Sequence, residues 1–133
     1  MAFRPRILVV EEDAIIGVDL ADQLSELGCE VVGVVASVRE AVEVIDTIGC
    51  DIAVLDVNLS DETAAPIATK LKVLRIPFVT LTGYPSDQCP PELRSNGPVL
   101  FKPVRIEQLW AVVQERLAHH QDMGTVTSRP QSL

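Results

Sequence analysis

The sequence is poor in cysteine, in basic residues and in long apolar runs, and each shortage excludes a class of protein. Its three cysteines, Cys29, Cys50 and Cys89, are odd in number and too widely spaced for a disulfide framework or a zinc site. No apolar run approaches the ~20 residues of a membrane-spanning helix. Acidic residues beginning at Glu11 interrupt the apolar start too early for a secretory signal. We therefore expect a cytoplasmic protein with reduced cysteines and no membrane partner.

Basic residues are also outnumbered by acidic ones. The chain has 11 Lys and Arg against 19 Asp and Glu, which gives a net charge of −8 at pH 7. Nucleic-acid binding needs clustered Lys and Arg to neutralise phosphates, so we expect no nucleic-acid partner. The acidic balance fits either a protein that binds other proteins or one that gathers carboxylates around a metal ion, and charge alone does not separate these two.

Two hydrophobic patterns alternate along the chain. Short β-branched runs predict strands at 7–10, 31–35, 52–55, 78–81 and 99–101, while apolar residues at helical spacing predict helices at 15–27, 38–48, 67–74 and 106–117. Ser37 followed by Glu40 is typical of a capping box at a helix start, and Gly28 and Gly49 are placed to end two helices. Strands that are apolar on both faces indicate a parallel sheet that is covered on both sides.

This alternation predicts an α/β fold, a doubly wound five-stranded parallel sheet with helices on both faces. Residues 1–120 are expected to form one domain. The segment 83–98 carries four prolines and two glycines, so the fourth helix should be short or irregular, around 91–94. Residues 121–133 lose the apolar periodicity and are expected to form a disordered C-terminal tail with no further domain.

Polar residues stand where four of these strands end. Ligands of open α/β sheets bind beyond the carboxyl ends of the strands, and all these ends lie at one edge. Taken singly, each such residue is an ordinary turn or cap residue, but together they predict a site. They are Glu11 and Glu12 after the first strand, Asp56 after the third, Thr82 and Gly83 after the fourth, and Lys102 after the fifth.

The residue types predict the chemistry of this site. The carboxylates of Glu11, Glu12 and Asp56 would repel one another within a few ångströms, and a hard divalent cation such as Mg²⁺ would relieve the repulsion. An Asp carboxylate can act as a nucleophile and form an aspartyl-phosphate, which makes Asp56 the central candidate. Lys102 would neutralise charge on the phosphoryl group, and the hydroxyl of Thr82 could donate to a phosphoryl oxygen. Gly83 lets its backbone N–H approach closely.

From about residue 5 to residue 118 the chain resembles the CheY-like receiver domains of two-component response regulators. The motifs that carry the likeness are ILVVEED, AVLDVNL, PFVTLTGY and FKPV. The resemblance implies strand order 2-1-3-4-5, with Asp56 accepting a phosphoryl group from a histidine kinase or a histidine phosphotransferase. It also implies that Glu11, Glu12, Asp56 and the backbone carbonyl of Asn58 bind Mg²⁺. By the same likeness Thr82 is the switch residue, Lys102 is the functional lysine, and the bond before Pro103 is cis.

Three departures from the family pattern stand out. The second acid, Glu12, is usually Asp, so metal affinity or geometry can differ, and Asp13 is an alternative ligand despite its register. The aromatic switch position falls near Val99, which is not aromatic. The run Thr82-Gly83-Tyr84 and the proline-rich segment resemble instead the FAT GUY single-domain receivers of alphaproteobacteria, in which Tyr84 would replace the missing aromatic residue as part of the switch.

The resemblance implies a stand-alone receiver rather than an enzyme, although it can catalyse its own phosphorylation and dephosphorylation. Such a protein acts in trans on an unknown downstream protein, as a shuttle, a phosphate sink or an allosteric partner. The alternative is a degenerate receiver that acts as a constitutive protein-binding module because Glu12 spoils the metal site. A flavodoxin-like enzyme is a weaker alternative, because Glu11, Glu12 and Asp13 would repel phosphate. Asn58 also removes the paired carboxylate of phosphatases that use an Asp nucleophile.

Overall fold

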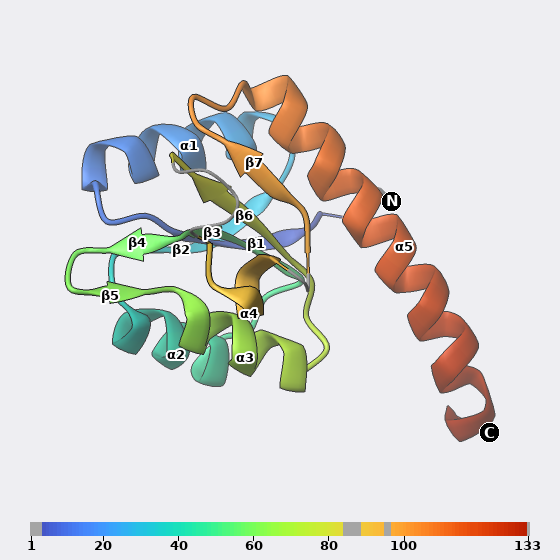
Figure 1. The fold of residues 1–133 in the computed structure, drawn as a ribbon. Helices are drawn as coiled ribbons and strands as arrows, with labels where there is room; N and C mark the ends of the chain where they lie inside the picture. The colour runs from blue at the N-terminus through green and yellow to red at the C-terminus, as the bar shows by residue number, and fades with distance from the viewer. Residues whose placement is uncertain (1–3, 84–88, 95–96, 133) are drawn as a thin grey trace.

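The computed structural model describes residues 4–83, 89–94 and 97–132, with side chains of the last stretch as far as His119. Strands and helices are arranged in three layers (Figure 1). The strands of the main sheet are β1 (Arg6–Val10), β2 (Glu30–Val35), β3 (Ile52–Asp56), β6 (Phe78–Thr82) and β7 (Val99–Phe101). The helices are α1 (Ala14–Glu26), α2 (Val38–Thr47), α3 (Ala65–Val73), α4 (Pro91–Arg94) and α5 (Ile106–Ser132).

Within the described residues the main sheet has five strands in the order β2-β1-β3-β6-β7, and every neighbouring pair is parallel. This is the predicted order 2-1-3-4-5. The fourth and fifth strands of the main sheet are labelled β6 and β7, because the labels β4 (Asn58–Leu59) and β5 (Glu62–Thr63) belong to a small antiparallel hairpin. Helices α1 and α5 cover one face of the sheet, and α2, α3 and α4 cover the other (Figure 1). The predicted doubly wound fold is confirmed.

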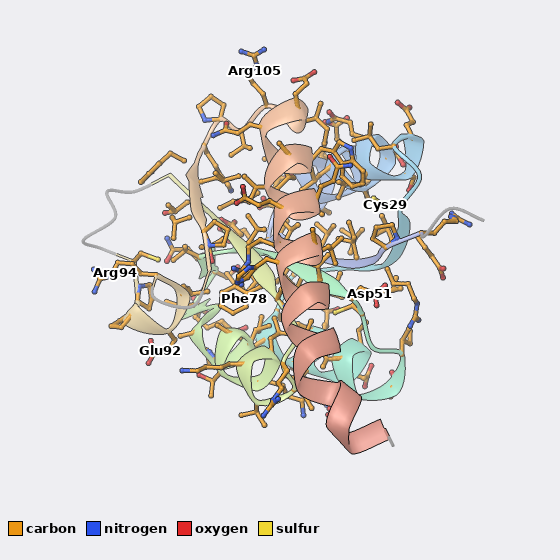
Figure 2. The ribbon with its side chains drawn as sticks, turned by 90° about the vertical axis from the view of Figure 1, so that its right-hand side faces the viewer. Cys29, Asp51, Phe78, Glu92, Arg94 and Arg105 are labelled. Atoms are coloured by element: carbon orange, nitrogen blue, oxygen red, sulfur yellow. The ribbon has the colours of Figure 1, made fainter. Side chains whose placement is uncertain are left out.

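Successive side chains of each strand enter opposite cores, as the twofold repeat of a strand requires. Ile7 and Val9 of β1 pack on the side of α1 and α5, whereas Leu8 and Val10 pack on the side of α2 and α3. Figure 2 looks onto α5 from outside and labels Phe78, which belongs to the core on the α3 side. All five residues of β3 are buried, because this central strand has a strand on each side and helices on both faces.

Helix ends agree with the sequence signals. The Asp13 carboxylate caps α1 by accepting hydrogen bonds from the N–H groups of Ile15 at 2.9 Å and Ile16 at 3.2 Å. The predicted capping box at α2 is present, since Ser37 Oγ accepts from the N–H of Glu40 at 3.1 Å. The Asp13 side chain is therefore held at the start of α1.

The segment between β6 and β7 has the short helix that its prolines predict, since α4 spans only Pro91–Arg94. At the other end, the backbone of α5 stays helical to Ser132, past the residue at which we expected the domain to end. Leu117 is the last α5 side chain in the apolar core of the described residues, and α5 runs on past the body of the molecule (Figure 1). A domain that ends near residue 120, with disorder after it, remains a prediction.

The three cysteines are free thiols, with Cys29 and Cys89 buried and Cys50 half-buried. Burial raises the pKa of each thiol, that of Cys50 to about 11, so they stay protonated at neutral pH. No helix in the described part of the chain combines the length and hydrophobicity needed to cross a bilayer.

Candidate functional site

Four predicted site residues meet at the carboxyl edge of the sheet. Asp56 is the last residue of β3 and Thr82 the last of β6, while Glu11 and Lys102 directly follow β1 and β7. Parallel strands bring their carboxyl ends to one edge, so residues distant in sequence become neighbours. Lys102 and Glu11 are 91 positions apart, yet their side chains form a hydrogen bond.

A lysine joins two buried acids at the centre of the site. Lys102 Nζ lies 3.0 Å from Asp56 Oδ1 and 3.2 Å from Glu11 Oε1. Asp56 is 7% exposed and Glu11 4%, whereas the Lys102 side chain is 32% exposed. The ammonium group therefore lies between two desolvated carboxylates on the side of the site that is open to solvent.

Backbone hydrogen bonds continue past the strand ends and hold these residues in place. The N–H of Glu11 donates to the carbonyl of Val35 at 2.9 Å, and the N–H of Lys102 donates to that of Thr82 at 2.8 Å. The Lys102–Pro103 peptide bond is cis, the geometry that the resemblance implies. Backbone hydrogen bonds of the sheet therefore fix the positions of Glu11 and Lys102.

The surroundings of Asp56 oppose its charge. Burial, the largest effect, and the neighbouring Glu11 raise the pKa of Asp56, while the hydrogen bond and charge of Lys102 lower it, and the net result is a pKa of about 6. For Lys102, burial favours the neutral amine, but the hydrogen bonds and charges of Asp56 and Glu11 outweigh it and raise the lysine pKa. At neutral pH the site therefore has an ionised Asp56 beside a charged lysine.

Glu12 lies apart from the other two acids. Its Oε2 accepts hydrogen bonds from the N–H of Ser60 at 2.9 Å and from Ser60 Oγ at 3.1 Å. Asp13, the alternative ligand, caps α1 with its side chain and donates its N–H to Glu11 Oε2 at 3.1 Å. The sequence predicts three clustered carboxylates, but the structure brings together Glu11 and Asp56 only. Sequence reasoning missed Ser60, because a contact across 48 positions leaves no local pattern.

The oxygen donors at this edge fit a hard divalent cation. Glu11 and Asp56 supply carboxylates, and Asn58, two residues after Asp56 at the start of β4, can supply a backbone carbonyl. The raised pKa of Asp56 indicates that one lysine does not fully compensate the negative charge. Among the residues whose side chains are described, no three His, Cys, Asp or Glu side chains already form a metal centre. The Glu12 carboxylate would have to move to join the other donors, and Ser60 holds its Oε2.

The predicted switch residues are described in part. Thr82 is 1% exposed at the end of β6, while Gly83 is exposed, with open space where a Cβ would stand. Tyr84 lies outside the described residues. Val99, at the position of the usual aromatic residue, is half-buried in β7 and pairs with Thr80 of β6.

A cleft of about 460 Å³ opens beside the site, between α1 and the start of α5. Glu11, Lys102 and Pro103 line its inner end, and apolar side chains that include Ile16 and Ile106 line its walls. The cleft therefore leads to the Lys102 ammonium group, which contacts Asp56.

Comparison with known proteins gives relatives but no match to a family model. The transcriptional regulatory protein PdtaR of Mycobacterium tuberculosis is 31% identical over 112 residues, which are 82% of this chain and 55% of PdtaR. The chain thus spans about half the length of that relative.

Solved structures match over nearly their whole length. SdrG from Sphingomonas melonis Fr1 is 35% identical with a TM-score of 0.75, covering 88% of this chain and 99% of SdrG. A CheY-like response regulator receiver domain protein from Methanospirillum hungatei JF-1 is 25% identical with a TM-score of 0.82, covering 92% of this chain and all of that one (100%). The strand order, the acids and lysine at the carboxyl edge, and these likenesses agree, and the chain belongs to the CheY-like receiver domains of response regulators.

Proposed function

We propose that this receiver accepts a phosphoryl group on Asp56 from a phosphohistidine of a histidine kinase or a histidine phosphotransferase. The observation that carries the proposal is the buried Asp56 carboxylate, 3.0 Å from Lys102 at the open edge of the sheet. An Asp56 oxygen attacks phosphorus, the P–O bond forms, and the P–N bond to the donor histidine breaks. The imidazole leaves with the electron pair of that bond and takes up a proton.

The neighbours of Asp56 make this transfer favourable. Lys102 keeps its positive charge and lies where it can neutralise phosphoryl oxygens as well as Asp56. The Thr82 hydroxyl and the Gly83 N–H come at the end of β6, at the same edge, and can donate to the transferred group. Glu11, Asp56, the Asn58 carbonyl and, once its carboxylate moves toward them, Glu12 would hold Mg²⁺. When bound, this ion would neutralise the carboxylates and the phosphoryl oxygens.

The surface of α1 supports a protein as the phosphoryl donor. Ile15 is 82% exposed, Ile16 50% and Val18 52%, next to the cleft that leads to Lys102. Asp19 lies beside these residues and lines that cleft. An apolar strip with acidic neighbours suits a helix of a histidine kinase or phosphotransferase that carries apolar residues and basic flanks.

The phosphorylated receiver acts in trans in the cytoplasm. It binds an unknown downstream protein or passes on its phosphoryl group as a shuttle or sink. Thr82, Gly83 and Tyr84 form the switch in the manner of the FAT GUY receivers. Support comes from Val99, which leaves the usual aromatic position without a ring. The receiver also catalyses its own phosphorylation and dephosphorylation.

A second candidate function is favoured by Glu12. Because its carboxylate is bound to Ser60, the metal site is incomplete as it stands. A receiver that never completed it would be a constitutive protein-binding module. The two functions differ in one measurable property, which is phosphorylation of Asp56 that depends on metal.

The test is to incubate the protein with acetyl phosphate and Mg²⁺ and to record its intact mass. Asp56→Asn and a sample with EDTA are the controls, and Asp22→Asn on the exposed side of α1 is the matched Asp-to-Asn control. We expect one phosphoryl adduct on the wild-type protein and on Asp22→Asn, and none on Asp56→Asn or with EDTA. Beryllofluoride, a stable phosphoryl analogue, detects a site whose adduct is short-lived. A folded wild-type protein that neither forms an adduct nor binds beryllofluoride would favour the constitutive module.

A further inference from the structure

Ser60 occupies an unusual turn close to the phospho-acceptor site. It lies between β4 and β5, whose paired residues are Asn58 with Thr63 and Leu59 with Glu62. Its φ of 60° is in the left-handed region, which residues other than glycine seldom adopt. In this conformation both its N–H and its hydroxyl donate to the Glu12 carboxylate. The start of α1 and this hairpin lie on the same side of the molecule (Figure 1).

The hairpin is fixed from other directions as well. Glu62 Oε2 accepts a hydrogen bond from the N–H of Val38, at the start of α2, at 3.0 Å. Leu59 is buried in the core on the α2 and α3 side. Ser60 is therefore held by contacts that do not involve Glu12, and these contacts oppose a movement of the turn with the Glu12 carboxylate toward Asp56.

Glu12 would have to move to bind a metal ion beside Glu11 and Asp56, because among the described side chains these three carboxylates are not grouped closely enough to hold one ion. Its Oε2 takes both hydrogen bonds from Ser60, and a metal ion beside Glu11 and Asp56 would need the same carboxylate. Hydrogen bonds to an ionised carboxylate are stronger than those between neutral groups, although exposure to water weakens them here. A movement of the Glu12 carboxylate toward Glu11 and Asp56 would stretch or break the hydrogen bonds to its Oε2, whichever of its two oxygens bound the ion.

We infer that Ser60 determines the magnesium affinity of this receiver by competing with the metal for Glu12. The inference rests on the proposed function, because it takes Glu12 as a metal ligand. It identifies Ser60 as a positioning residue: it holds Glu12 away from the metal ligands and does not touch the reacting atoms.

The experiment is calorimetric titration of the full chain with Mg²⁺ alone. Ser60→Ala and Ser60→Gly both remove the hydroxyl and keep the N–H, and the glycine variant also removes the strain of a positive φ. Ser37→Ala is the matched control, because Ser37 also donates its hydroxyl to a glutamate, Glu40, but caps α2 instead. We expect both Ser60 variants to bind Mg²⁺ about 3- to 10-fold more tightly, the effect of one net hydrogen bond, and Ser37→Ala to bind as the wild type does.

A double-mutant cycle shows whether the effect passes through Glu12. In Glu12→Gln the side chain still accepts from Ser60 but is a poorer metal ligand, so adding Ser60→Ala to that variant should change the affinity little. The Ser60 amide resonance should also shift on Mg²⁺ addition in the wild type and much less in Glu12→Gln. Equal Mg²⁺ affinity of the wild type and both Ser60 variants would overturn the inference and leave the proposed function intact. No Mg²⁺ binding by any of these proteins would overturn the inference and the metal-dependent function together.

Discussion

Replacing Asp56 by Asn should stabilise the folded protein at neutral pH while abolishing phosphoryl acceptance. The wild-type carboxylate is buried next to Glu11, and Lys102 compensates this environment only in part. Asn has nearly the same shape and no charge, so it removes the desolvation penalty without opening a cavity. A group retained for reaction rather than for stability should behave in this way.

The magnitude can be worked out from the pKa of Asp56. Its value of about 6 in the folded state lies above the ordinary value of 3.8, so the folded state keeps the proton to higher pH than the unfolded state. Between about pH 4 and pH 6 the folded protein therefore loses stability as the pH rises, and the loss is complete at pH 7. A difference of about two pH units corresponds to a ceiling of about 3 kcal/mol. Because the site relaxes around the charge, we expect Asp56→Asn to gain about 1–2 kcal/mol at pH 7.

The assay is urea unfolding of the wild type and Asp56→Asn at pH 7 and at pH 4, without divalent cations. The gain should shrink toward zero at pH 4, where the wild-type carboxyl group is largely protonated in the folded state. Asp22→Asn, on the exposed side of α1, makes the same change in net charge and should alter the free energy of unfolding by less than about 0.5 kcal/mol. An equal gain at both pH values would refute the argument, since it would come from packing of the amide and not from loss of a buried charge. So would the absence of any gain at pH 7.

Further predictions concern the metal, the lysine, one glycine and the end of α5. Mg²⁺ should raise the melting temperature of the wild type but hardly that of Asp56→Asn, as measured by differential scanning calorimetry. Lys102→Met should slow phosphorylation by acetyl phosphate at least about tenfold in a mass-spectrometric time course, because the cation beside Asp56 is lost; an unchanged rate would contradict its role. Gly97→Ala should destabilise by about 1–3 kcal/mol in urea, because its Cβ would stand 2.6 Å from the carbonyl oxygen of Phe78. Ending the chain after His120 should leave the urea midpoint unchanged, because Leu117 is the last α5 side chain in the described core.

Much of the fold was predictable because local signals and global packing agree. The buried strands read as continuous apolar runs, and the capping box of Ser37 and Glu40 marks the start of α2. The carboxyl-edge rule then placed Asp56 and Lys102 together although they are far apart in sequence. That rule needs only the fact that the strands are parallel, which their apolar character already indicates.

The features that could not be predicted depend on contacts between loops. Glu12 and Glu11 are neighbours in the sequence, yet one contacts Ser60 and the other Lys102, because consecutive residues after a strand point in different directions. The hairpin that presents Ser60 has strands of two residues each, too short for any periodicity to reveal. A side chain at a strand end can thus be assigned to an edge of the sheet from sequence, but not to a partner.

The complete burial of β3 has a consequence for protein engineering. The strand that ends in Asp56 contributes nothing else to the surface, so its first four residues are constrained by packing alone. The chemistry around Asp56 is supplied by residues outside that strand, such as Glu11, Ser60 and Lys102. Substitutions in those loops would therefore test the proposed metal binding and phosphoryl transfer one loop at a time on an unchanged core. A library of variants restricted to the loops at this edge would change the site while every variant kept the same buried core.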